Sequence, residues 1–369
     1  MEQLPANVPA IKSNSYISVD AWDSFTKKEE FYQKILQSST ENIIYLGHNE
    51  WDYYTSQAFP RFGAVLDFLK KSNRILHTTT ASYPHDGEPK HPNLKVYYWI
   101  DWYFRKTFNR CIYASKDYEG SNFNQFSYYK QSLNNSNFEY YITSLNYRSH
   151  RHRCHMIDLL AKNDLIEGNA IGWHHLTEIH GSNASMYEWK YFTPQKLSFD
   201  DNFNEDWTFP PKKYFNAFAQ IISESSPVVP IFSEKTVMGI ICHKPFLIAG
   251  PYGMHKKLKD LNFEIYDEIF DYAFDDVVDE GIRYQMIMDN FVRLQKENTL
   301  TDLIKLQEKI KSKLIHNFEN LKKIVFDMSS VPPIIRKIYN IYTLDGIDYD
   351  HWSNSILSSI DGHRRDFYK

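Results

Sequence analysis

Residues 233–253 read Ser-Glu-Lys-Thr-Val-Met-Gly-Ile-Ile-Cys-His-Lys-Pro-Phe-Leu-Ile-Ala-Gly-Pro-Tyr-Gly. The polar start is typical of a helix N-terminus, and residues 246–250 form an apolar strand candidate that runs into a Pro-Tyr-Gly turn. A strand-like segment, Val228-Val229-Pro230-Ile231, precedes this stretch, and a helical pattern over residues 254–261 follows it. A strand, helix, strand, helix order in about 35 residues suits one parallel βαβ repeat, so we expect an α/β fold.

The same alternation occurs in the N-terminal part of the chain. Strand-like segments lie at residues 43–47, 74–78 and 94–99, and an amphipathic helical pattern lies at residues 62–69. Alternating strands and helices predict parallel pairing of the strands.

A second series begins near residue 140. A strand-like segment at residues 140–144 leads into a helix with Met156, Leu159 and Leu160 at helical spacing. Three prolines mark residues 190–211 as a long loop, which leads into a predicted helix holding Phe218, Ile221 and Ile222. A domain boundary near residue 135 is therefore expected.

Beyond residue 280 the chain reads as helical. One apolar stripe is drawn by Leu303, Leu306, Ile310, Leu314, Leu321 and Ile324. The simpler interpretation is a helix packed on its own lobe, and the alternative is a partner-binding helix. We predict an N-terminal Rossmann-like lobe over residues 1–135, a second Rossmann-like lobe over 136–300 and a helical extension over 301–369.

Composition limits the class of protein. The 369 residues are 16 % aromatic and 24 % charged, which is typical of a globular protein, and the formal net charge of −4 gives no general case for binding nucleic acid. Three widely spaced cysteines do not form a disulfide framework and indicate a reducing compartment. The start Met-Glu-Gln-Leu-Pro lacks a basic region and an apolar core, and no run approaches a membrane span. We expect a cytoplasmic protein without an integral membrane segment.

The Ser-Glu-Lys-Thr start has the chemistry of an anion site. Ser233 can cap a helix whose free N–H groups face an anion, Lys235 adds a full positive charge for a diphosphate, and Glu234 can accept hydrogen bonds from ribose hydroxyl groups. The alternative is an ordinary charged first turn on a surface helix.

A second cluster, Arg148-Ser149-His150-Arg151-His152-Arg153-Cys154-His155, lies at the start of a predicted helix. Its arginines can bind phosphate oxygens through two N–H groups at once, whereas the alternative is a set of surface charges. The histidines here and at positions 174, 175 and 180 match no known metal-binding spacing, and no Asp-x-Asp lies beside a strand, so we expect no metal. The chain also lacks the glycine-rich and nucleophile motifs of dehydrogenases, P-loop kinases and α/β-hydrolases.

The order of several motifs resembles a family of glycosyltransferases found in phages and marine bacteria. The C-terminal half of that family is similar to that of fucosyltransferases, which have the two-lobed GT-B architecture. The resemblance covers roughly residues 140–320 and rests on residues 145–148, 152–153, 157–160, 171–173, 223–225, 232–236, 244–250 and 258–263.

The resemblance implies roles for particular residues. Glu234 and Lys235 correspond to a Glu-Lys pair that contacts the ribose and the diphosphate of the donor, and Arg153 corresponds to an arginine that contacts phosphate. The full set expected to bind the donor is Arg148, Arg153, Ser233, Glu234, Lys235 and Thr236. Members of this architecture generally work without a metal or another cofactor.

An acceptor hydroxyl needs a general base, and candidates follow the strands of the N-terminal lobe. These candidates are Glu50, Asp52, His48 and Asp101, each of which has the alternative of being an ordinary loop residue. We expect an enzyme that moves a sugar from a nucleotide-diphosphate sugar to a glycan or glycolipid acceptor. The alternatives are a viral glycosyltransferase that modifies DNA and a non-catalytic protein that binds nucleotide sugars or glycans.

Overall fold

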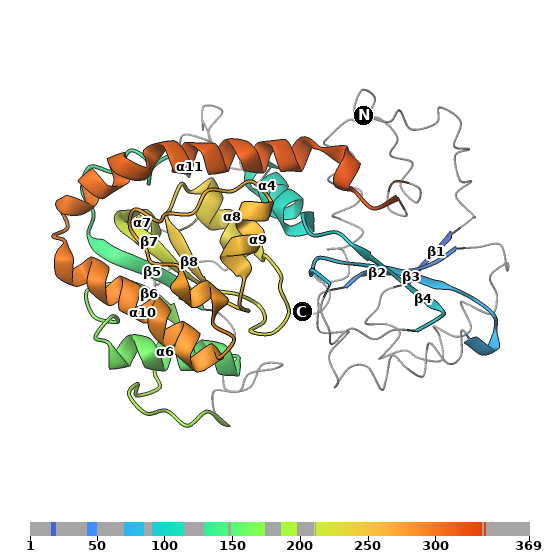
Figure 1. The fold of residues 1–369 in the computed structure, drawn as a ribbon, viewed down its shortest axis with the longest axis horizontal. Coiled ribbons are helices and arrows are strands. Elements are labelled where there is room, and N and C mark those ends of the chain that lie inside the picture. Colours follow the sequence, from blue (N-terminus) through green and yellow to red (C-terminus); the bar gives the residue numbers. More distant parts are fainter. Residues whose placement is uncertain are drawn as a thin grey trace. The chain divides into compact units, whose positions relative to one another are not determined.

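A computed structural model describes residues 16–19, 43–49, 70–84, 91–113, 129–146, 149–173, 186–197, 210, 212–333 and 336. The fold is mixed α/β, with two four-stranded parallel sheets and seven α-helices in these ranges (Figure 1). The expected α/β class is therefore confirmed.

The chain divides into two compact units. Unit 1 combines residues 1–102 with 326–369, and unit 2 comprises Tyr103–Val325. The three-part division at residues 135 and 300, which assigns a role to each part, stays a prediction.

Unit 1 contains the sheet β1-β2-β3-β4, in which all pairs are parallel. The strands span Tyr16–Val19, Ile43–Asn49, Leu76–Thr80 and Leu94–Tyr98, and the last three confirm predicted strands. Thr78, Thr79 and Thr80 are all buried toward the carboxyl end of β3. The 3-10 helix η5 (Met328–Ser330) also belongs to this unit.

Unit 2 contains the sheet β6-β5-β7-β8, again with parallel pairs throughout. The strands are β5 (Tyr140–Asn146), β6 (Ala170–Trp173), β7 (Ala217–Ser223) and β8 (Phe246–Ala249). All residues of β6, β7 and β8 are buried, as expected for a parallel sheet covered on both faces.

Helices cover both faces of this sheet. Figure 1 shows α6 (Arg151–Lys162) and α10 (Glu280–Glu297) on one side, and α8 (Glu234–Ile241) and α9 (Met254–Asp260) on the other. The remaining helices are α4 (Trp102–Tyr113), α7 (Lys212–Asn216), α11 (Asp302–Phe326) and the 3-10 helix η4 (Ala273–Asp276).

The strand β7 corrects the sequence-based assignment. The predicted helix with Phe218, Ile221 and Ile222 is a strand, and residues 228–231 belong to a loop instead of a strand. A strand buried on both faces shows no alternation of apolar and polar residues, so apolar residues at helical spacing do not distinguish it from a buried helix.

The long helix α11 packs its predicted stripe inward. Leu303, Ile310, Leu314 and Leu321 are at most 1 % exposed, which supports a helix that serves its own lobe. Arg105 of α4 donates hydrogen bonds to the carbonyl oxygens of Ile324 and Val325 at 2.8 and 2.6 Å, at the C-terminal end of α11.

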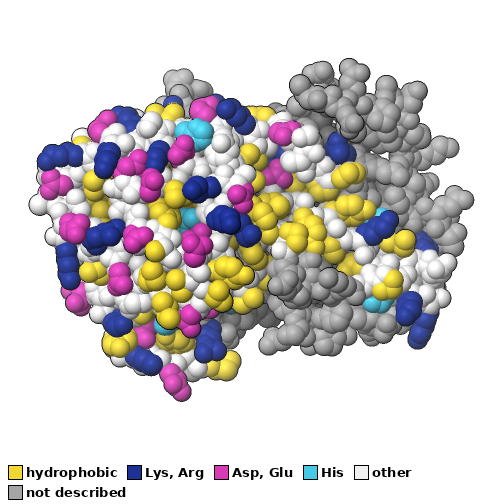
Figure 2. All heavy atoms as spheres, in the orientation of Figure 1, with side chains coloured by type: hydrophobic (Ala, Val, Ile, Leu, Met, Phe, Trp, Pro, Cys, Tyr) yellow, Lys and Arg dark blue, Asp and Glu magenta, His cyan; other side chains and the backbone are white. Residues whose placement is uncertain are grey.

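The surface carries charges of both signs. On the face of unit 2 drawn in Figure 2, Lys and Arg side chains alternate with Asp and Glu side chains, and apolar side chains lie between them. In the part of the chain that the structure describes, no helix is both long enough and apolar enough to cross a membrane.

Candidate functional site

The candidate site lies at the carboxyl ends of β5 and β7 in unit 2. These strands are neighbours, β5 continues through α6 to β6 on one side, and β7 continues through α8 to β8 on the other. The strand order therefore reverses between β5 and β7. Ligands of open parallel sheets bind outside the carboxyl ends of the strands at such a reversal.

The N-terminus of α8 lies at this edge of the sheet. Ser233 has an extended backbone, and its hydroxyl group accepts a hydrogen bond from the Lys235 N–H at 3.3 Å. The cap explains why the helix starts at Glu234. Unsatisfied N–H groups and the helix dipole at this end favour an anionic ligand.

A buried carboxylate joins β7 to α8. Glu224 follows β7 directly and is fully buried. Its carboxylate accepts hydrogen bonds from the Ser233 N–H at 3.1 Å and from the Thr236 hydroxyl at 2.5 Å, and also from the Ser225 N–H at 3.2 Å. Burial raises the pKa of Glu224, while the Lys235 charge and these hydrogen bonds oppose the rise. Glu224 thus fixes the position of the α8 N-terminus relative to the sheet.

The backbone carbonyl of Glu224 joins the same edge to α6. It accepts hydrogen bonds from His152 Nε2 at 2.9 Å and from an Arg153 guanidinium N–H at 3.4 Å. Burial, together with the Arg153 charge, lowers the pKa of His152 to about 3. His152 is therefore neutral at pH 7 and leaves the positive charge at this edge to Arg153 and Lys235.

Lys235 and Glu234 form an ion pair at the first turn of α8. Lys235 Nζ lies 2.8 Å from Glu234 Oε1, and the two side chains are 4 % and 30 % exposed. Partial burial works to raise the pKa of Glu234, but the Lys235 charge and hydrogen bond outweigh it and hold the pKa at about 2. An anionic ligand at Lys235 would therefore meet an ammonium group already oriented by a carboxylate.

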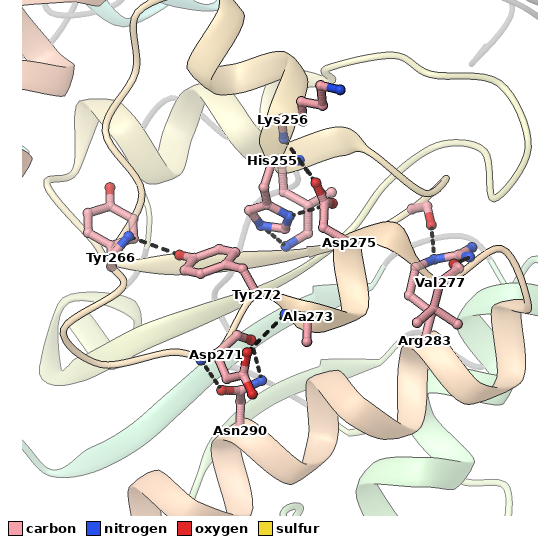
Figure 3. A network of polar contacts seen from close by, with 12 residues as sticks. His255, Lys256, Tyr266, Asp271, Tyr272, Ala273, Asp275, Val277, Arg283 and Asn290 are labelled. Carbon is pink, nitrogen blue, oxygen red and sulfur yellow. Dashed lines mark hydrogen bonds and ion pairs between the residues drawn. The ribbon is translucent and has the colours of Figure 1, made fainter.

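The loop after β8 is hydrogen-bonded to helix α10, and the start of α9 that follows it is hydrogen-bonded to η4. Arg283 donates hydrogen bonds to the carbonyl oxygens of Gly250 at 3.0 Å and Val277 at 2.6 Å (Figure 3). His255 accepts from the Ile248 N–H at 3.1 Å and donates to Asp275 at 3.1 Å, which ties α9 to β8 and η4. These contacts make the loop over residues 250–253 a fixed border of the site.

The structure brings together five of the residues predicted to bind the donor. Arg153 lies beside the α8 N-terminus with Ser233, Glu234, Lys235 and Thr236. Arg148 lies outside the described residues, as do the base candidates Glu50 and Asp52 and the side chain of His48.

Asp101 belongs to unit 1, is 6 % exposed and accepts a hydrogen bond from the Ser330 hydroxyl at 2.8 Å. Its role as a base stays a prediction.

The sequence-based set missed Glu224 and His152, which organise the site. Both residues lie in segments that carry the family resemblance, 152–153 and 223–225, but the resemblance implies no role for either of them. The local signal for Glu224 is an acidic residue directly after an apolar run, and that run is the strand β7. Among the described residues, no three His, Cys, Asp or Glu side chains converge as metal ligands would.

Comparison of the chain with protein-family models, with curated proteins and with solved structures found no match.

Proposed function

We propose that this protein is a glycosyltransferase of GT-B architecture that takes its sugar from a nucleotide-diphosphate donor and transfers it to a glycan or glycolipid. One observation carries the proposal. Two cationic side chains, Arg153 and Lys235, and the capped N-terminus of α8 are gathered around Glu224 at the strand-order reversal of a parallel sheet.

The proposed chemistry uses this charge in the transition state. Breaking the bond between the sugar carbon and the diphosphate develops negative charge on the leaving group. This charge is stabilised by Lys235, Arg153 and the α8 N-terminus. The same groups interact less strongly with the donor before the bond breaks, because its bridging oxygen then carries less charge. Glu224 holds the N-terminus of α8 in place, so its N–H groups need little reorganisation as the charge forms.

The acceptor side of the proposal rests on unit 1. A general base must remove the proton of the acceptor hydroxyl, and Glu50, Asp52 and Asp101 are its candidates. In this proposal the donor is held without a metal.

Thermal unfolding with a panel of GDP, UDP, ADP and CMP and their sugars tests the donor site. Saturation at about 100 times Kd stabilises a one-site protein by about 2.7 kcal/mol, which gives a measurable rise in Tm. We expect a rise with at least one nucleoside diphosphate and its loss in Lys235→Met. The control Lys259→Met removes an exposed lysine of α9 and should keep the full response. No response of the wild-type protein to any nucleotide would overturn the proposal.

A chelator tests the metal-independent part separately. Transfer activity and the nucleotide-induced rise in Tm should survive EDTA. Loss of both with EDTA, and recovery with a divalent cation, would show that the diphosphate is held through a metal.

A further inference from the structure

Asn146 and Ser223 are the last residues of β5 and β7. The two strands pair in parallel, with Tyr140 opposite Ala217 and Ser144 opposite Ile221. The same register, continued to the strand ends, places Asn146 opposite Ser223. Two polar side chains thus face each other where the strand order of the sheet reverses.

Both side chains carry a buried polar atom that has no hydrogen-bond partner in the described part of the structure. Asn146 is 3 % exposed, and its amide group donates to Ser144 Oγ at 3.0 Å and to the Gly172 carbonyl at 3.5 Å. Its Oδ1 atom and the Oγ atom of Ser223, which is 1 % exposed, remain unsatisfied among the residues described. Buried polar groups in folded proteins are nearly always hydrogen-bonded, so a ligand that hydrogen-bonds this pair would satisfy two otherwise unpaired atoms.

The pair lies on the other face of the sheet from the contacts of Glu224. Side chains alternate along a strand, and in β7 the face of Gln220 and Glu224 meets α8. Ser223 and Asn146 therefore lie on the face covered by α6 and α10. They lie at the same carboxyl edge of the sheet as Arg153 and the first turn of α8, but they carry no charge.

The chemistry of the unsatisfied atoms defines the partner. Because both hydrogens of the Asn146 amide are directed to Ser144 and Gly172, only its acceptor Oδ1 is available. A phosphate group that is fully ionised has no proton to donate. A hydroxyl group fits, since it can donate its one hydrogen to Asn146 Oδ1 and accept a hydrogen bond from the Ser223 hydroxyl group.

We propose that Asn146 and Ser223 bind a ring hydroxyl group of the donor, on the ribose or on the transferred sugar, and so contribute to donor selectivity. The inference rests on the proposed function, because it assumes that a nucleotide sugar binds at this edge of the sheet. It adds a neutral subsite to the cationic one.

Calorimetric titration of the full chain tests the subsite. The probes are the nucleoside diphosphate that raises Tm most, its 2′-deoxy and 3′-deoxy forms, and the matching nucleotide sugar. Ser223→Ala and Asn146→Ala should each weaken binding about 2- to 10-fold, the effect of one neutral hydrogen bond. The control is Thr143→Val, which removes another unsatisfied buried hydroxyl, three residues earlier in β5 on the opposite face, and should leave binding unchanged.

The pattern of losses identifies the hydroxyl group. If it belongs to the ribose, Ser223→Ala weakens the binding of the nucleoside diphosphate and of the nucleotide sugar alike. The binding of one of the deoxy forms, which lacks that hydroxyl group, is then unchanged by the substitution. If it belongs to the transferred sugar, only the nucleotide sugar loses affinity. Equal affinities of Ser223→Ala and wild type for every probe would overturn the inference while leaving the donor site intact. Failure of the wild type to bind any nucleotide would overturn the proposed function and the inference with it.

Discussion

His152 is a buried imidazole beside a guanidinium group, and it is kept neutral by that environment. Its folded pKa of about 3 lies below the ordinary value of 6.5. As the pH falls below 6.5, the unfolded chain takes up this proton before the folded one does. The stability contributed by neutral His152 is therefore fully present above pH 6.5 and is lost progressively toward pH 3.

The variant His152→Gln keeps an N–H donor for the Glu224 carbonyl but does not titrate. Between pH 6.5 and pH 4.5 the wild type should lose about 2 kcal/mol more unfolding free energy than the variant, at about 1.4 kcal/mol per pH unit for one proton. Urea unfolding at both pH values measures the difference. Parallel losses in the two proteins would show that His152 is not buried in its neutral form.

Lys244 is a second buried base, located two residues before β8. It is fully buried, donates to the Ala217 carbonyl and lies 5.0 Å from the centre of the Tyr214 ring. Burial lowers its pKa from 10.5 to about 7. The stability that comes with neutral Lys244 is present above pH 10.5 and is lost as the pH falls toward 7, because the unfolded chain holds the proton throughout that range.

Lys244→Met should therefore be more stable than the wild type at pH 7, by about 1–3 kcal/mol after the lost hydrogen bond is counted. Its advantage should shrink by about 1 kcal/mol per pH unit between pH 7 and pH 8.5, because the folded lysine is half deprotonated at pH 7 and the unfolded one is still protonated at pH 8.5. Chemical unfolding across this range measures it, with Lys259→Met as an exposed control. A constant difference at all pH values would contradict a depressed pKa of Lys244.

At the scale of single elements, variants of two helix caps distinguish an effect on stability from an effect on nucleotide binding. Ser233 caps α8, and Asp279 caps α10 by accepting from the Ile282 N–H at 2.8 Å. Ser233→Ala and Asp279→Ala should each lower the unfolding free energy by about 1 kcal/mol.

Of the two variants, only Ser233→Ala should also weaken nucleotide binding, because α8 and not α10 follows β7 at the proposed diphosphate site. Urea unfolding and titration of both variants with the same nucleotide provide the comparison. Equal nucleotide affinities of the two variants would show that the α8 N-terminus does not belong to the donor site.

The elements also show what local sequence can and cannot predict. Strands β2 to β5 and β8, and helices α6 and α8 to α11, follow from hydrophobic period and capping residues and are confirmed. Strand β7 was wrongly predicted as a helix because both of its faces are buried. The residues 233–236 are predicted because they lie at one helix start. The contacts of Glu224 with α8, and the position of Asn146 opposite Ser223, instead depend on how β7 lies beside α8 and β5. Contacts between distant segments carry no local signal.

At the scale of the whole molecule, the chain forms two compact units, each with a parallel sheet. Among the described residues, the hydrogen-bond partners of Glu224 belong to unit 2, so the candidate donor site is built from that unit. A donor should therefore stabilise one unit selectively, because ligand binding adds only to the stability of the unit that must be folded to bind it.

Hydrogen exchange of the full chain, with and without the best nucleoside diphosphate, tests this separation. We expect slower exchange of amides in peptides covering residues 149–156 and 224–241, and in those strands of unit 2 that exchange only when the unit opens. Peptides from β3 and β4 should exchange at unchanged rates, which serves as the internal control. In Lys235→Met the slowing in unit 2 should disappear at the same nucleotide concentration. Protection centred on β3 and β4 would instead place the nucleotide on unit 1 and reverse the assignment of donor and acceptor sides.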